Sequence, residues 1–549
     1  MKQHSFIGLS GIILILIQGI AIAQTLPSAL TDLLNPPASG PALSVDTTAD
    51  RHVISPDIYG LNWADPAIAT ELALPVERWG GNGVEKYNWQ LGSSNTGADY
   101  YYENIADCFS FDSGCSSGNV PYYRAFISRA LARGSKPLVE LPLMGYVAKN
   151  APTDHPFTCS FPKTQFPNQQ SFDPYDTNCG NGVSSNGTPL TANPTTAGVA
   201  IDAANARDWI NDLKARYGSA SAGGVRLYEL GNEPALWNST HPDMHPSATT
   251  YNELYSKSRD TALAVKQADS SAKVLAFSEW GWPNYFCSAA DNLSQGCSAS
   301  SPDRAAHGGT ALVEWLLQQF RSYEQTNGQR LMDYIDVHYY RQGGSTADVT
   351  RSLWDTNYND PSWINDKIRL IPRMHEWVTN NYPGTKIALS EYNLSISGQD
   401  TLNAIMQADV LGIFAREGLD LATRWSIGDD GTGSALTHIY DAFRLYRNYD
   451  GAGSRFGDTY VRSTSADQTQ IAIYSALRGS DGKLTIVVIN KTNKTLSSKL
   501  TLNGSSPTAN AQVWRWSGNG IQKQADQALN GGAISYPAMS MTLYVMAVR

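Results

Sequence analysis

The sequence predicts a (β/α)8 barrel followed by a β-sandwich, on three observations. Eight short apolar runs alternate with stretches of helical periodicity, which is the pattern of a parallel barrel. From about Arg455 the runs alternate in polarity, are divided by Gly, Asn, Asp and Ser turns, and have no helical stretch between them. The chain has 549 residues, 42% of them apolar, which is enough for several domains and too apolar for a disordered chain.

The apolar runs and helical stretches set the domain boundaries. The eight runs are 58–63, 76–79, 138–143, 225–230, 274–278, 334–339, 387–390 and 421–426. The clearest helical stretches are 200–217, 248–267, 311–327, 366–380 and 402–417. We expect a barrel over residues 55–455 and a sandwich of antiparallel strands over residues 456–549, joined by a strand from about residues 43–53.

The first 23 residues resemble a signal for export. A short basic start precedes the apolar stretch Phe6–Ile17, and Ala21-Ile22-Ala23 is a cleavage signal. No later run reaches the roughly 20 apolar residues that span a bilayer. The net charge of −9 argues against nucleic acid as a partner. We therefore expect a secreted monomer, free of the membrane after cleavage, that acts on an uncharged substrate.

Six cysteines in an exported chain imply disulfides, for which 15 connectivities exist. They occur as three pairs close in sequence, and we predict the bridges Cys108–Cys115, Cys159–Cys179 and Cys287–Cys297. Metal ligation is a weaker interpretation, because the chain has no C-x-x-C spacing beside a histidine.

Two glutamates follow buried strands at positions typical of barrel chemistry, which lies at the carboxyl ends of the strands. The fourth run leads into Asn232-Glu233-Pro234 and the seventh into Ser390-Glu391. Strands four and seven lie across the barrel mouth from each other, so the two carboxylates are able to face one another. Such a pair is what glycosidic cleavage requires, and Asn232 is placed to bond a sugar 2-hydroxyl.

Other acidic residues compete for these roles. Glu279 ends the fifth run in a context similar to that of Glu391. Glu140 and Glu229 are expected in the barrel interior, paired with Arg78, because buried charges need partners. From these residues alone, the choice between Glu279 and Glu391 stays open.

The motifs around these glutamates resemble glycoside hydrolase family 44, the endoglucanase and xyloglucanase family. The similarity extends from about residue 43 to the C-terminus, and its most specific part is the stretch 229–242, which holds N-E-P-A-L-W-N-S-T-H-P. The other matching stretches are 76–83, 87–90, 99–104, 280–282, 285–286, 336–340 and 389–393.

The resemblance implies a barrel with a β-sandwich and retaining endo-hydrolysis of β-1,4-glucans. It implies that Glu233 is the general acid/base and Glu391 the nucleophile, and it gives Glu279 no catalytic role. The expected substrate is a β-glucan polysaccharide of the cellulose or xyloglucan type. The cysteine-paired loops have no counterpart in the family motifs.

Further residues are candidates for binding substrate or supporting the glutamates. His338 and Tyr340 follow the sixth strand and are placed to orient Glu391, and Arg78 is placed to keep it ionised. The aromatic candidates for stacking on sugars are Trp63, Trp237, Trp282, Tyr392 and Trp425.

No cofactor or metal is expected for the reaction. A structural Ca²⁺ at Asp99 and Glu103 is a weaker option than a plain pair of charges at a helix start. Two other functions remain open: a related barrel hemicellulase (mannanase or xylanase), and a polysaccharide-binding protein without activity.

Overall fold

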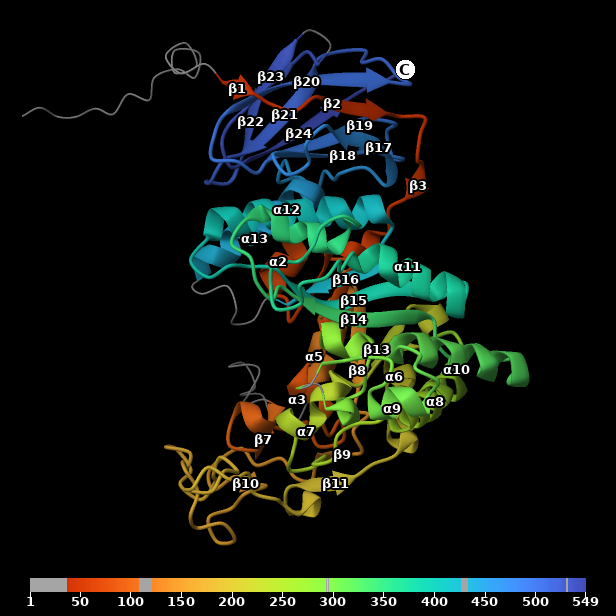
Figure 1. Cartoon of the computed structure of the whole chain (residues 1–549), viewed down its shortest axis with the longest axis vertical. Coiled ribbons are helices and arrows are strands. Elements are labelled where there is room, and N and C mark those ends of the chain that lie inside the picture. The colour runs from red at the N-terminus through yellow and green to blue at the C-terminus, as the bar shows by residue number, and fades with distance from the viewer. Residues whose placement is uncertain (1–36, 108–120, 293, 295, 426–432, 530–531) are drawn as a thin grey trace, which may run out of the picture.

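The computed structural model describes residues 37–107, 121–292, 294, 296–425, 433–529 and 532–549. The predicted signal peptide and the predicted Cys108–Cys115 bridge lie outside these residues. A barrel and a curled β-sheet are stacked along the longest axis of the molecule (Figure 1). Among the residues described, no helix is long and apolar enough to cross a membrane.

Eight parallel strands close the barrel in chain order, and each coincides with one of the predicted apolar runs, so the predicted fold class is confirmed. Nearly every residue of these strands is buried, as expected for parallel strands covered by helices. The strands are β4 (Gly60–Asn62), β5 (Val76–Trp79), β8 (Lys136–Leu141), β12 (Leu227–Leu230), β13 (Lys273–Glu279), β14 (Tyr334–Tyr340), β15 (Lys386–Asn393) and β16 (Leu421–Arg424).

The barrel interior changes from apolar to charged along the strands. An apolar cluster of buried side chains from the barrel strands forms the floor of the barrel interior. It consists of Val76, Leu138, Leu227, Leu275, Tyr334, Ala388 and Leu421. Because side chains of a strand alternate with a period of two, the inward residues one step further along are Arg78, Glu140, Glu229, Asp336, Ser390 and Thr423. A bulge in β13 turns Phe277 outward against Phe320 and places the Ser278 hydroxyl in this layer, where it bonds Glu229 and Asp336. The strands therefore deliver a layer of buried polar groups beneath the mouth of the barrel.

Helices surround the barrel, and most carry one apolar face toward it. In α8 the Thr250 hydroxyl caps the first turn and Leu254, Ala262 and Val265 are buried. The helix α12 is buried along almost its whole length. The helices are α2 (Pro66–Glu71), α3 (Asn82–Glu85), α5 (Tyr122–Ala132), α6 (Ala203–Tyr217), α7 (Trp237–Thr240), α8 (Tyr251–Ala268), α9 (Pro302–Ala306), α10 (Leu312–Asn327), α11 (Leu370–Asn381), α12 (Asp400–Glu417) and α13 (Gly433–Arg447).

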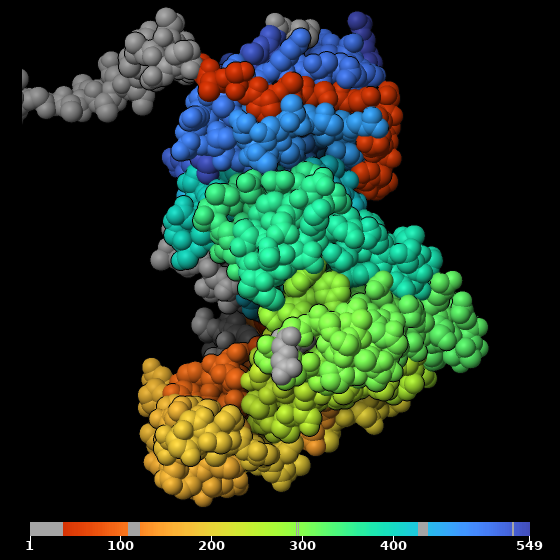
Figure 2. Space-filling view, viewed as in Figure 1, coloured from red at the N-terminus to blue at the C-terminus, as the bar shows by residue number. Residues whose placement is uncertain are grey.

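An 11-stranded curled sheet forms the second body, and the N-terminal strands join it (Figures 1 and 2). The strands after residue 456 pair antiparallel, as predicted, whereas the N-terminal strands β1 and β2 run parallel to β20, so the sheet is mixed. Its strands are β1 (Ala38–Ser39), β2 (Leu43–Asp46), β3 (His52–Val53), β17 (Thr459–Ser465), β18 (Ile471–Leu477), β19 (Leu484–Asn490), β20 (Leu496–Asn503), β21 (Ala511–Trp516), β22 (Ile521–Gln527), β23 (Ala533–Tyr536) and β24 (Ser540–Met546).

The sheet packs directly on the barrel helices α12 and α13. The buried Asp409 of α12 accepts hydrogen bonds from the Tyr474 hydroxyl at 2.7 Å and from Lys491 Nζ at 2.6 Å. On α13, Asp441 accepts from the Trp516 indole at 2.8 Å. These contacts explain why α12 is buried on all sides: it lies between the two bodies.

A small lobe extends the barrel at the lower end of Figure 1. It contains the strands β6 (Ser93–Asn95), β7 (Glu103–Ala106) and β10 (Thr158–Cys159), and the pair β9 (Tyr146–Ala148) with β11 (Gly198–Ala200). The bridge Cys159–Cys179 lies in this lobe, and Cys287–Cys297 lies after β13. Both bridges agree with the predicted pairing.

Candidate active site

Glu233 and Glu391 face each other at the mouth of the barrel. Glu391 lies within β15, and Glu233 follows β12 in a left-handed conformation with φ 45°. One carboxylate oxygen of each residue and a ring nitrogen of His338 all lie within 4.8 Å of one another. The predicted juxtaposition of these two carboxylates is therefore present in the structure.

Strong donors hold the carboxylate of Glu391. Arg78 Nη1 donates to its Oε1 at 2.7 Å, and the Tyr340 hydroxyl donates to its Oε2 at 2.6 Å. Each carboxylate oxygen thus has its own donor, and the bond from the guanidinium is charge-assisted. Burial, and after it the Glu391 charge, raise the pKa of Tyr340 well above its usual range, so its hydroxyl keeps its proton.

Arg78 connects Glu391 to the charged layer below. Its guanidinium, fully buried, donates to Glu229 Oε1 at 2.9 Å and to Asn232 Oδ1 at 3.1 Å, and lies 3.4 Å from Glu140 Oε2. Burial by itself raises the pKa of Glu229, but Arg78 outweighs it and holds that pKa at about 2. Arg78 is thus the positive centre of a group of buried carboxylates.

Glu233 has different surroundings. His338 Nδ1 lies 2.9 Å from Glu233 Oε1 and 3.6 Å from Glu391 Oε2, while His338 Nε2 lies 3.0 Å from the Ser390 hydroxyl. Burial, and with it the Glu391 charge, raise the pKa of Glu233 despite the opposing effect of His338. We predicted His338 as a residue that orients Glu391, yet its nearest carboxylate belongs to Glu233.

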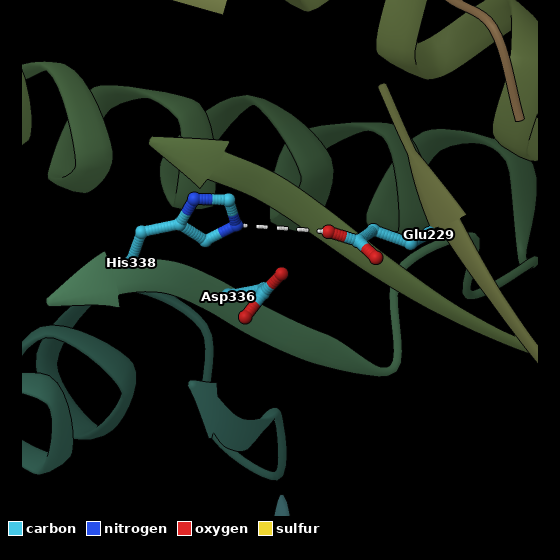
Figure 3. A group of neighbouring side chains, drawn as sticks. All are labelled: Glu229, Asp336 and His338. Atoms are coloured by element: carbon cyan, nitrogen blue, oxygen red, sulfur yellow. Dashed lines mark ion pairs between the residues drawn. The ribbon is translucent and has the colours of Figure 1, made fainter. Parts of the chain in front are cut away.

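A second group with metal-ligand geometry lies deeper. Glu229, Asp336 and His338 point toward one another across the barrel interior (Figure 3). Their oxygens already have protein donors: the Ser278 hydroxyl lies 2.8 Å from Glu229 Oε1, and the Ser390 hydroxyl bonds Asp336. Burial, and then Glu229, raise the pKa of Asp336 to about 6. The positive charge of Arg78, which bonds Glu229, offsets the negative charge of this group.

A groove of about 770 Å³ opens above the two glutamates. Of the predicted substrate-binding residues, Trp63, Asn232, Tyr340 and Trp425 line it. Its wall toward the small lobe was not predicted, because these residues are not at strand ends; it consists of Asn82, Ser94, Thr96, Asp99, Tyr100 and Tyr122.

Several predicted substrate-binding residues are outside the groove. Trp237 is fully buried and donates from its indole to the Asn232 carbonyl at 2.9 Å. Tyr392 is buried against Phe414, and its hydroxyl accepts from Gln407 at 3.0 Å. Neither ring is available to a sugar, which corrects the prediction for both.

Arg78 and His338 are also fully buried. They therefore bind carboxylates rather than substrate, which corrects their assignment to the substrate. Trp282 packs edge-on against Phe286 with Arg373 over its ring, and it too is absent from the groove lining.

Glu279, the competing glutamate, is buried and does not line the groove. Burial raises its pKa well above the usual range, which favours the protonated form. Asp99 and Glu103, the candidates for a structural Ca²⁺, contact different residues. Asp99 lines the groove and bonds Asn82, whereas Glu103 is buried against Asp173, and its pKa is raised to about 8 by burial and then by Asp173.

Comparison with known proteins places these features in one family. Residues 93–343 match glycoside hydrolase family 44. The chain is 37% identical to CelM2, a bifunctional glucanase-xylanase from a metagenome library, over 93% of this chain and 100% of CelM2, with a TM-score of 0.86. A family 44 xyloglucanase of Paenibacillus polymyxa is 27% identical over 93% of this chain and 100% of that one, with a TM-score of 0.77.

Two relatives known by sequence agree. Endoglucanase A of Paenibacillus lautus is 29% identical over 96% of this chain and 75% of the relative. Beta-mannanase/endoglucanase A of Caldicellulosiruptor saccharolyticus is 30% identical over 87% of this chain, which spans only 36% of that longer protein. From the barrel, the facing glutamates and the end-to-end match with CelM2, we conclude that this chain belongs to glycoside hydrolase family 44.

Proposed function

We propose that the chain is a secreted, retaining endo-β-1,4-glucanase of the cellulase or xyloglucanase type, in which Glu391 is the nucleophile and Glu233 the acid/base. The observation that carries this proposal is the spacing of the two carboxylates, whose nearer oxygens lie within 4.8 Å. Retaining enzymes hold their carboxyl groups about 5–5.5 Å apart, and inverting enzymes about 6.5–9.5 Å apart. The short spacing leaves no room for a water molecule between Glu391 and the sugar.

The proposed reaction is a double displacement, which this geometry supports. Glu391, held ionised by Arg78 and Tyr340, attacks the anomeric carbon and forms the glycosyl-enzyme. Glu233 gives its proton to the departing glycosidic oxygen, and then, as a carboxylate, takes a proton from the water that releases the sugar. Asn232, in the groove wall, is placed to bond the 2-hydroxyl. Trp425 and Trp63 supply aromatic surface for the sugars on either side.

The preferred polysaccharide has several candidates. The names of the relatives include glucanase, xylanase, xyloglucanase and β-mannanase activities. We favour a β-glucan because the name of each of these relatives includes a glucanase, endoglucanase or xyloglucanase activity. A mannanase or xylanase is the second candidate, and a binding protein without activity is disfavoured by the intact carboxylate pair.

One experiment tests the proposal. The wild-type protein is incubated with cellulose derivative, xyloglucan, mixed-linkage glucan, mannan and xylan, and the anomer first released is observed by ¹H NMR. We expect fragments of intermediate length from a glucan, with the β-anomer formed first. Initial release of the α-anomer would reject retention, and fastest cleavage of mannan or xylan would reject the glucanase assignment. No hydrolysis of any polymer would leave only the binding protein.

A further inference from the structure

Another buried glutamate, Glu85, fixes the backbone that presents Glu233. Glu85 ends the short helix α3 and is fully buried beneath the groove. Its Oε2 accepts a hydrogen bond from the amide of Asn232 at 2.6 Å. Its Oε1 accepts from the amides of Leu143 and Met144, at 2.7 and 2.6 Å. A single carboxylate therefore ties the loop after β8 to the residue directly before Glu233.

The turn that carries Glu233 needs such support. Gly231 has φ 68° and Glu233 has φ 45°, and both lie in the left-handed region that is unfavourable for residues with a side chain. A Cβ on residue 231 would lie 2.9 Å from Glu85 Oε2 and 2.8 Å from Leu143 Cβ. Glycine is required there because the Glu85 carboxylate and the loop after β8 approach the backbone closely.

The same short helix also holds the side chain of Asn232. Asn82, in the first turn of α3, accepts a hydrogen bond from Asn232 Nδ2 at 3.1 Å. The backbone amide of Glu233 donates a hydrogen bond to the Ser278 carbonyl at 3.0 Å. Arg78 also donates to Asn232 Oδ1 at 3.1 Å, so Asn232 and Glu233 are held through side-chain and backbone contacts, and Glu85 is the residue that bonds the Asn232 amide.

We propose that Glu85 is a positioning residue for the acid/base: through the amide of Asn232 it sets the place from which Glu233 delivers its proton to the leaving oxygen. This inference rests on the proposed function, in which Glu233 is the acid. It predicts that loss of the Glu85 carboxylate impairs proton delivery selectively. Attack by Glu391 is spared, because the Glu391 carboxylate is held by Arg78 and Tyr340 through hydrogen bonds that do not involve Glu85.

The test compares leaving groups. A glucan needs a proton on its departing oxygen, whereas an aryl cellobioside with a dinitrophenolate leaving group does not. The Glu85→Gln variant replaces one carboxylate oxygen by an NH₂ group. This group cannot accept a hydrogen bond from the backbone amide that it faces. We expect kcat/KM for glucan to fall on the order of tenfold to a hundredfold, since one buried amide loses its acceptor. For the aryl glycoside we expect a change of less than about threefold.

Two further variants make the result interpretable. Gly231→Ala pushes on Glu85 Oε2 from the opposite side and should show the same selective loss. Glu77→Gln is the matched control: Glu77 is a buried glutamate of the neighbouring strand, but it pairs with Arg133, away from the groove, and the ratio of the two activities should stay at the wild-type value.

Glu233→Gln is measured in the same assay to separate this inference from the proposed function. If Glu233→Gln shows no dependence on the leaving group, the acid/base assignment itself is wrong. If Glu233→Gln shows that dependence while Glu85→Gln loses both activities equally, Glu85 supports only the fold and our inference is rejected.

Discussion

The two halves of the active site hold their glutamates in different ways. On the β15 side, Glu391 is fixed by its own side chain, with a guanidinium on one oxygen and a phenol on the other. On the β12 side, the carboxylate of Glu233 has His338 as its nearest charged partner, and its backbone is held instead. The Glu391 carboxylate accepts from the Arg78 guanidinium and the Tyr340 hydroxyl, whereas the Glu233 carboxylate lies against His338.

This difference agrees with the roles that we propose for the two glutamates. A nucleophile must stay ionised and aimed, which the donors on Glu391 ensure. An acid/base must gain and lose a proton in each cycle, so strong fixed donors on its carboxylate would hold it ionised and oppose its task. Burial and the neighbouring negative charge instead favour the protonated form of Glu233. The same buried environment therefore yields two roles because Arg78 and Tyr340 reach only one of the carboxylates.

The largest expected effect comes from removing the Glu391 carboxylate. Glu391→Gln should lower kcat/KM on glucan by about 10⁴-fold or more, since a nucleophile is lost. Glu279→Gln is the control. Glu279 is buried outside the groove lining, so its amide variant should retain activity within about tenfold of wild type. An inactive Glu279→Gln protein together with an active Glu391→Gln protein would reverse the assignment.

Removing the guanidinium should mainly affect stability. Arg78→Met leaves Glu140, Glu229 and Glu391 without their shared cation, and breaking a buried ion pair in this way costs about 3–5 kcal/mol. The expected result is a large fall in the melting temperature. Arg133→Met, which breaks the partly exposed pair with Glu77, should cost about 1 kcal/mol. Equal losses in the two variants would show that Arg78 does not neutralise the charged layer.

The rim of the groove should respond differently from its centre. Cys159 and Cys179 close a loop of 20 residues, and replacing both by alanine should lower stability by about 3 kcal/mol through the entropy of the unfolded chain. The two glutamates are held by barrel strands, so activity on a short soluble substrate should stay within about twofold. Differential scanning calorimetry and oligosaccharide assays measure the two effects. Loss of activity without loss of stability would show that the lobe acts on the carboxylates directly.

The barrel could be predicted because its strands are buried on both faces. Such strands appear as continuous apolar runs, and all eight were recognised. The strand β22 (Ile521–Gln527) lacks such a signal, because it is largely exposed and its polar residues do not alternate with apolar ones. The glutamates were found because both follow buried strands, where barrel chemistry is expected.

The walls of the groove were harder to predict. Trp237 and Tyr392 stand one to four residues from a catalytic glutamate, but position near a strand end does not say which way a ring points. The groove residues Tyr100 and Tyr122 come from the small lobe and from α5, far from any strand-end motif. Glu85 was not singled out either, because its importance depends on amides supplied by two other loops.

Trp425 offers a smaller effect on the Glu391 side. Its ring lines the groove and lies over Gly81, where an added Cβ would be 2.9 Å from the ring. Trp425→Ala should lower kcat/KM on glucan about tenfold, because a stacking surface is lost. Trp425→Phe keeps an aromatic face and should recover most of the activity. Unchanged kinetics in the alanine variant would remove Trp425 from the substrate site.

The smallest expected effect is a change in the pKa of Glu233. It tests the electrostatic interaction between Glu391 and Glu233. The negative charge of Glu391 is one cause of the raised pKa of Glu233. Replacing Glu391 by the neutral Gln removes that charge, so the ionised form of Glu233 becomes easier to reach and its pKa should fall. ¹³C NMR of labelled glutamate carboxyl carbons, recorded through a pH titration, measures the change directly.

In the wild type this coupling has a visible consequence. Glu233 must be protonated to act as the acid, so activity should fall as the pH rises through its raised pKa. Glu77→Gln, which removes a carboxylate outside the groove, should leave both the titration and this basic limb in place. A Glu233 pKa that rises or stays constant in Glu391→Gln would mean that burial alone keeps the acid protonated, and that the two halves of the site titrate independently.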